Sequence, residues 1–125
     1  MRLLLDTQIV LWSVLDDPRL TPACRDALSD RAHALHVSAV SVWEVAIKTG
    51  LGKLRVPPEL WEAVRGAGVS PLPITWAHAR AVEGLPRLHA DPFDRMLIAQ
   101  ARVEGMVLMS ADAQIARYDV ALFAG

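Results

Sequence analysis

The feature that most constrains the fold is the alternation of short apolar runs with helix-like segments along the whole chain. Each run is too short for a buried helix and has the composition of a buried strand. Residues 69–74 form the weakest run, because Pro71 and Pro73 remove backbone donors and are tolerated only at a sheet edge. The expected strands are residues 2–5, 35–38, 69–74, 106–109 and 120–123.

Helix signals fall between these strands. Thr21-Pro22 and Asp91-Pro92 each place a capping side chain before a proline at the first helical position. Strands separated by helices predict an α/β fold of three layers, with helices on both faces of a mainly parallel sheet of about five strands. The expected helices are residues 9–14, 22–29, 40–49, 59–65, 75–83 and 92–103, with a short helical segment after Asp112.

Length and composition predict one domain over residues 1–125. A hydrophobic fraction of 53% and a charged fraction of 22% exclude a mainly disordered chain. No apolar run is long enough to span a bilayer, and the first residues lack the features of a signal peptide. We therefore expect a cytoplasmic protein. Cys24 is the only cysteine, so an internal disulfide is excluded and a core position is expected.

The net charge of −1 differs from that of a strongly basic nucleic-acid-binding domain. Binding to nucleic acid would therefore depend on a local patch or on a bound cation. His89 is a candidate substrate contact, and Arg95 either supports the site or pairs with a nearby acid. The other candidate phosphate contacts, whose alternative is a solvated surface, are Lys48, Lys53, Arg55, Arg80 and Arg87.

Four acidic residues are selected by their positions in this topology. Asp6 follows the first strand, and Asp112 lies just beyond the strand at residues 106–109. Both belong to the edge where parallel strands end and where ligands bind in open α/β sheets. Asp94 stands in the first turn of one helix and Glu44 about one turn into another, and these helices start at the same edge. We therefore expect the four carboxylates to converge.

Converging carboxylates require compensation. Two unit charges about 4 Å apart repel by roughly 4 kcal/mol at an effective dielectric constant near 20. Either protons are taken up or a cation binds, and oxygen ligands favour Mg²⁺ or Mn²⁺. Such an ion activates water and neutralises a phosphate, which is the chemistry of phosphodiester hydrolysis. Asp6 and Asp94 are the expected central ligands with Asp112 nearby, while Glu44 binds a second ion, positions water or acts as a base.

Four segments resemble the successive blocks of PIN domains, most closely those of VapC-type toxins of toxin–antitoxin pairs. Together they cover nearly the whole chain in the family's order: LLLDTQIVLW, SAVSVWEVAIKTGLGKL, HADPFDRMLIAQA and SADAQIARYDV. The resemblance implies a PIN-like nuclease fold that cleaves RNA with Mg²⁺ or Mn²⁺. It places the family's acids on Asp6, Glu44, Asp94 and Asp112 and its small polar residue on Ser110. Thr7 is expected to orient Asp6, and Asp91 belongs to the DPFD pattern with its role open.

The resemblance also implies partners. VapC-like toxins are held by an antitoxin whose tail fills an apolar groove and places an arginine or similar residue in the acidic pocket. Homodimerisation is implied as well. The chain has four tryptophans, for which core packing is the first interpretation, while one or two are candidates for lining such a groove. They are Trp12, Trp43, Trp61 and Trp76.

Two other classes of function remain as alternatives. In a phosphoryl-transfer domain Asp6 would carry the phosphate, but a HAD-like phosphatase needs a second Asp two residues later, where Gln8 stands. A receiver domain needs paired acids after its first strand and a lysine near its last strands, and neither is evident. A non-catalytic module with a PIN fold is less favoured, because all four acids are present.

Overall fold

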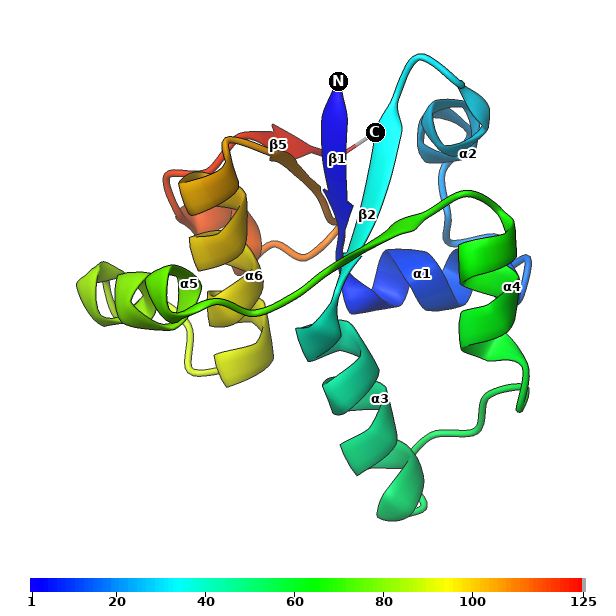
Figure 1. Ribbon diagram of the computed structural model, residues 1–125, viewed down its shortest axis with the longest axis horizontal. Coiled ribbons are helices and arrows are strands. Elements are labelled where there is room, and N and C mark those ends of the chain that lie inside the picture. The colour runs from blue at the N-terminus through cyan, green and yellow to red at the C-terminus, as the bar shows by residue number, and fades with distance from the viewer. Residues whose placement is uncertain (125) are drawn as a thin grey trace.

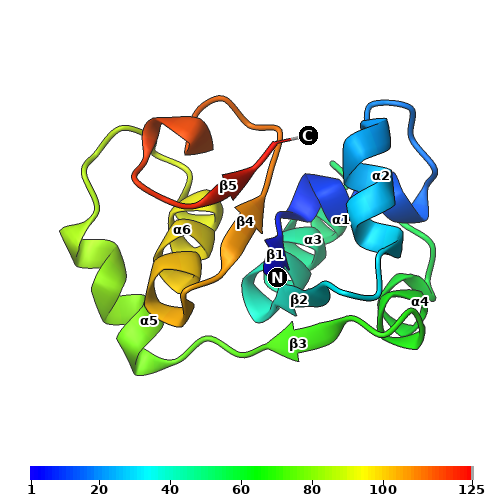
Figure 2. The ribbon, with the colours of Figure 1, turned by 90° about the horizontal axis from the view of Figure 1, so that it is seen from above.

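The computed structural model describes residues 1–124. Its centre is a five-stranded sheet of order β3-β2-β1-β4-β5 in which every neighbouring pair is parallel. Figure 2 shows this order from above, with β3 and β5 at the two edges. The strands are β1 (Arg2–Leu5), β2 (Ala34–Ser38), β3 (Ser70–Leu72), β4 (Val107–Met109) and β5 (Leu122–Phe123).

The two faces of the sheet carry separate hydrophobic cores. Successive strand residues point to opposite faces, so Leu3 and Leu5 of β1 enter one core while Leu4, fully buried, enters the other. The first core is covered by α1 (Thr7–Val14), α2 (Pro22–Ser29) and α4 (Leu60–Gly66). The second is covered by α5 (Trp76–Ala81), α6 (Pro92–Glu104) and the 3₁₀ turns η1 (Val82–Gly84) and η2 (Ile115–Arg117). The predicted three-layer α/β/α fold is confirmed.

The remaining helix, α3 (Ala39–Gly50), begins directly after β2 and extends beyond the ends of β1 and β2 (Figure 1). Its buried residues Val40 and Val45 belong to different cores, so α3 lies across the end of the sheet. The α3 helix thereby covers part of the edge at which the parallel strands end. No helix in residues 1–124 is both long and apolar enough to cross a membrane.

Most element boundaries agree with the sequence prediction, and the exceptions have local causes. The first helix starts at Thr7 rather than residue 9, because the Asp6 carboxylate accepts a hydrogen bond from the Ile9 amide and caps the helix. The helix predicted at residues 75–83 changes to the tighter η1 after Ala81. β3 is an edge strand, as its prolines predicted, and Cys24 is buried.

Candidate active site

A pocket of about 300 Å³ lies at the edge where the parallel strands end. It contains all four acids that the sequence singled out, so the structure brings them together. We call it the acidic pocket. Its lining residues are Asp6, Thr7, Gln8, Trp12, Glu44, Lys48, Asp91, Asp94, Ala111 and Asp112.

Asp6 is fixed at the point where β1 meets α1. Its backbone amide donates to the Met109 carbonyl at 3.0 Å, which continues the β1–β4 ladder by one residue. Its carboxylate caps α1 through the Ile9 amide at 2.8 Å. Burial raises the pKa of this carboxyl, hydrogen bonds from Ser110 and Ile9 oppose the rise, and repulsion from Asp112 and Glu44 adds to it. The ionised form is therefore costly unless a cation is present.

Asp94 and Asp91 occupy the start of α6. Asp91 Oδ1 accepts from the amides of Phe93 and Asp94, which confirms its predicted role as the N-cap. Asp94 Oδ2 lies 2.9 Å from Nε2 of His89, in the segment before α6. Burial raises the pKa of Asp94 to about 6, and repulsion from Asp91, Asp112 and Glu44 adds to this rise against the hydrogen bond from His89.

Asp112 enters the pocket from the segment after β4. The Ser110 hydroxyl accepts from the Asp112 amide at 3.1 Å, and the same side chain hydrogen-bonds to Asp6. Asp112 Oδ1 in turn accepts from the Gln114 amide. Ser110 is 2% exposed, so this buried hydroxyl couples the positions of the first and last acids. Its predicted place beside Asp112 is confirmed, while its function stays a prediction.

Glu44 has a side-chain partner on each of its two carboxylate oxygens. It is 6% exposed, its Oε1 accepts from the Thr7 hydroxyl at 2.7 Å, and its Oε2 is paired with Lys48 one turn later on α3. The Thr7 hydroxyl also hydrogen-bonds to Ser41. The expectation that Thr7 orients Asp6 is therefore wrong: the first turn of α1 points this hydroxyl across to α3, where it orients Glu44.

Lys48 has a different role from the surface cation that the sequence suggested. In the described part of the chain it is the only cation lining the acidic pocket. The hydrogen bond and charge of Glu44, with further attraction from Asp91 and Asp94, raise its pKa against desolvation. The signal was present in the sequence, because a lysine four residues after a glutamate on a helix lies beside it.

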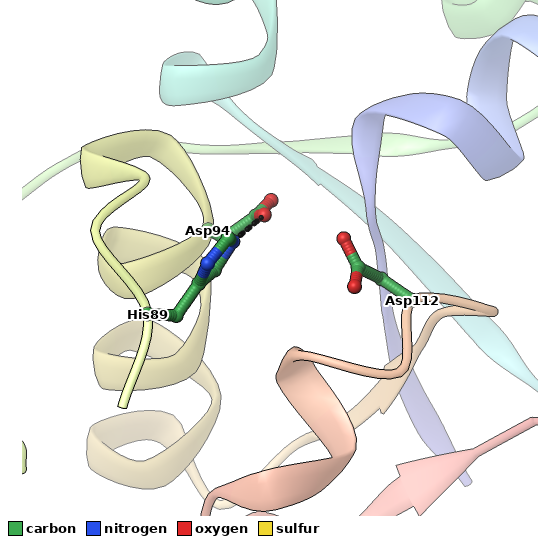
Figure 3. Close-up of side chains that lie close together, drawn as sticks. All are labelled: His89, Asp94 and Asp112. Carbon is green, nitrogen blue, oxygen red and sulfur yellow. Dashed lines mark hydrogen bonds and ion pairs between the residues drawn. The ribbon is translucent and has the colours of Figure 1, made fainter. Parts of the chain in front are cut away.

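The donor set of the pocket fits a divalent cation. Asp6, Asp94 and Asp112 contribute carboxylates, and Lys48, the only lining cation within residues 1–124, is already paired with Glu44. One ligand atom each from His89, Asp94 and Asp112 lies within 4.8 Å of the others, and the three side chains face a common space (Figure 3). Oxygen-rich clusters of this kind suit Mg²⁺ or Mn²⁺.

Arg95 lies outside the acidic pocket. Its guanidinium donates to the carbonyls of Pro86, Val82 and Leu85 and to the Tyr118 hydroxyl. Among residues 1–124 it forms no ion pair, so the predicted pairing with an acid is not observed. Arg95 instead fixes the segment that leads into α6, because a guanidinium offers five donors in a planar arrangement.

Beside the acidic pocket, on the other side of α3, lies an apolar groove of about 630 Å³. Trp43 and Trp61 line it, and the Trp43 ring packs edge-on against Phe93 of α6 at 5.3 Å. Trp43 is 58% and Trp76 90% exposed, so core packing is the wrong interpretation for both. The remaining lining residues are Val37, Ala39, Val42, Ala46, Val64, Arg65, Val69, Ser70, Pro71, Leu72 and Pro73.

Trp12 is the residue at the acidic pocket that the sequence analysis left without a role there. It lines the pocket, and its buried indole nitrogen has no hydrogen-bond partner in the described chain. Its ring also stacks beneath the Arg19 guanidinium at 5.2 Å. Tryptophans are common in packed cores, so the sequence alone carried no signal for a place at this pocket.

Comparison with known proteins gives a family and a set of structural neighbours. The model of the PIN domain family matches residues 3–121. No curated protein sequence matches the chain.

Three solved structures illustrate the likeness of the fold. VapBC2 from Rickettsia felis, bound to a promoter DNA fragment, contains a chain with TM-score 0.74 at 14% identity, with 98% of both chains covered. A chain of DNA-bound VapBC from Salmonella typhimurium has a TM-score of 0.71 at 16% sequence identity, and the match covers 98% of this chain and 97% of that chain. A chain of FitAcB from Neisseria gonorrhoeae has a TM-score of 0.63 at 20% sequence identity, and the match covers 97% of this chain and 96% of that chain.

Proposed function

Because the chain belongs to the PIN domain family, whose members are nucleases, we propose that it is a metal-dependent endoribonuclease acting as a VapC-type toxin. The observation that carries this proposal is the acidic pocket, where Asp6, Glu44, Asp94 and Asp112 meet from four distant parts of the chain. The structural neighbours supply further support, since they include two VapBC structures and a toxin–antitoxin complex. We also propose that it acts in the cytoplasm.

Asp6, Asp94 and Asp112 would hold the ion, which we propose to be Mg²⁺ or Mn²⁺. When bound, the ion would neutralise phosphate charge and make water a stronger nucleophile. The protein holds the carboxylates of the site in place before substrate binds. Asp6 is fixed by the β1–β4 ladder and the cap of α1, and Asp94 by the first turn of α6. Such preorganisation avoids reorganising the carboxylates during the reaction.

Glu44 is the proposed acceptor for the proton of the attacking water. Thr7 and Lys48 each occupy one of its oxygens, so its carboxylate is held in one orientation. An oxygen has two lone pairs, and one on either oxygen remains for water. The Lys48 ammonium places a positive charge beside Glu44 in a pocket that also holds Asp6, Asp91, Asp94 and Asp112.

Substrate binding must overcome a pocket that repels phosphate. The chain's net charge is −1, and the pocket's only lining cation in the described chain is bound to Glu44. RNA binding at this place therefore depends on the divalent ion.

The test is incubation of the purified, partner-free protein with mixed RNA in Mn²⁺, Mg²⁺ or EDTA. We expect cleavage only with a divalent ion, and its loss in Asp6→Asn and Asp94→Asn. Asp26→Asn on the exposed face of α2 is the matched control and retains activity. Equal cleavage by all variants would remove the proposed site. Metal binding without any RNA cleavage would favour the alternative, a non-catalytic PIN-fold module.

We propose a cognate antitoxin as the partner, with its tail in the apolar groove. The groove adjoins the acidic pocket across α3, so one peptide can reach both. Ala46→Gln places a polar side chain on the exposed groove wall of α3. We expect weaker binding of an antitoxin encoded beside this gene, measured by titration calorimetry, with RNA cleavage retained. Unchanged affinity would place the tail elsewhere.

A homodimer is also proposed, and light scattering after gel filtration tests it.

A further inference from the structure

We propose that His89, which lies beside the acidic pocket and contacts its lining residue Asp94, is a nitrogen ligand of the ion bound there, and that it makes the site prefer Mn²⁺ to Mg²⁺. This inference rests on the proposed metal-dependent function and deepens it. His89 was a candidate substrate contact from the sequence, because it stands two residues before Asp91. The structure places its side chain on Asp94 instead.

The spacing of the three side chains in Figure 3 fits one ion. An octahedral ion with bonds of about 2.1 Å holds neighbouring ligand atoms about 3 Å apart and opposite ones about 4.2 Å apart. His89 Nε2 and Asp94 Oδ2 are 2.9 Å apart, which is the separation of neighbouring ligands. Asp112 supplies a third atom, with all three within 4.8 Å. Small movements of exposed Asp112 therefore complete the set.

The backbone of the segment that carries His89 is held by hydrogen bonds to side chains from other parts of the chain. The His89 amide donates to the Tyr118 hydroxyl at 2.9 Å, and Arg95 donates to the same hydroxyl at 3.1 Å. The carbonyls of Pro86 and Leu88 accept from Arg95 and Arg117 at 2.9 and 2.7 Å. Three side chains, from α6 and the η2 region, thus fix the backbone that carries this imidazole.

Several carboxylate oxygens of the pocket already have partners in the protein, so a nitrogen atom can serve as an additional metal ligand. Thr7 and Lys48 occupy both oxygens of Glu44, and one oxygen of Asp6 caps α1. Without an ion, the His89 Nε2–H donates to Asp94. With an ion, the neutral imidazole carries its proton on Nδ1 and presents the Nε2 lone pair. Mg²⁺ takes oxygen ligands and dehydrates reluctantly, whereas Mn²⁺ is a first-row transition ion that binds sites of mixed nitrogen and oxygen donors, so the expected preference is for Mn²⁺.

The test uses the full chain with Mn²⁺ as the probe. Pulsed electron paramagnetic resonance of the Mn²⁺-loaded wild type is expected to show coupling to a directly bound ¹⁴N nucleus. His89→Gln is expected to lose this coupling and at least tenfold in Mn²⁺ affinity by titration calorimetry, with less than a threefold change for Mg²⁺. His33→Gln, at the opposite end of the sheet beside Met1, is the control and retains the coupling.

Three results would overturn the inference. Bound Mn²⁺ without ¹⁴N coupling in the wild type would exclude His89 as a ligand, a result that needs no variant to fold. Equal losses of Mn²⁺ and Mg²⁺ affinity in His89→Gln would make His89 a positioning residue for Asp94, because outer partners act on either ion. No Mn²⁺ binding, together with no RNA cleavage, would remove the proposed function as well.

Discussion

The metal-free protein is expected to lose stability as the pH rises through the range where Asp94 ionises. Its pKa is raised from the ordinary 3.8 to about 6, chiefly by burial, and its side chain is 16% exposed. A raised pKa means that the folded state binds the proton more tightly than the unfolded state. The stabilising contribution is therefore fully present below about pH 4 and is lost as the pH passes 6.

The expected size of this loss is about 3 kcal/mol, from 1.36 kcal/mol for each tenfold difference in proton affinity. The assay is urea denaturation in EDTA from pH 4 to 7.5, comparing the wild type with Asp94→Asn. The difference in unfolding free energy between the two proteins reports Asp94 together with its repulsion from Asp91, Asp112 and Glu44. Relative to the variant, the wild type should lose about 2.4 kcal/mol over this range, because an unfolded aspartate is already more than half ionised at pH 4.

The control is Asp26→Asn, whose side chain is exposed, and its curve should run parallel to the wild type. Saturating Mn²⁺ at pH 7.5 should restore the stability of the wild type by about 2.7 kcal/mol at a hundredfold excess over Kd. The same addition should leave Asp94→Asn nearly unchanged. A pH-independent difference between wild type and Asp94→Asn would refute the idea that burial strains this carboxylate.

Three further substitutions test the supports of the site by urea denaturation. Lys48→Met leaves the buried Glu44 carboxylate without its cation and should cost about 1–3 kcal/mol at neutral pH; no loss would mean that the ion pair is dispensable. Gly105→Ala should cost about 1 kcal/mol, since φ is +66° at this helix end, and an unchanged midpoint would contradict that strain. Thr75→Ala removes the capping box of α5 and should also cost about 1 kcal/mol, whereas a neutral effect would show that His78 alone holds this end.

The layout of the fold was accessible from the sequence because its signals are local. The apolar run of Leu3, Leu4 and Leu5 is buried on both faces of the sheet, and proline at residues 71 and 73 marked the edge strand. The convergence of Asp6 and Asp112 followed from topology alone, since all parallel strands end at one edge. The start of α1 was misplaced because Asp6 has a second role as its cap.

The parts that the sequence did not predict depend on side-chain directions across elements. Thr7 is adjacent to Asp6 in the chain, yet its hydroxyl reaches Glu44 because the first helical turn rotates it toward α3. Arg95 is one residue after Asp94, yet its guanidinium turns to the carbonyls before α6. Neighbours in sequence point to different sides of a helix, and only tertiary structure shows what each side faces.

Exposed aromatic residues could not be predicted from composition. Core packing is the usual role of tryptophan, but Trp76 is 90% exposed and Trp43 borders the apolar groove. One or two tryptophans were expected to line an apolar groove, and Trp43 and Trp61 do so, but no periodic pattern in the sequence distinguishes them from the other two. Exposure of large apolar side chains marks an interaction surface more often than a defect.

The central claim is that carboxylates from distant parts of the chain share one divalent ion. Anomalous X-ray scattering from crystals grown with Mn²⁺ tests it most directly. The expected result is an anomalous peak within bonding distance of Asp6, Asp94 and Asp112, which is absent from crystals of Asp6→Asn. A peak elsewhere on the surface, or none in this pocket at saturating Mn²⁺, would contradict the claim.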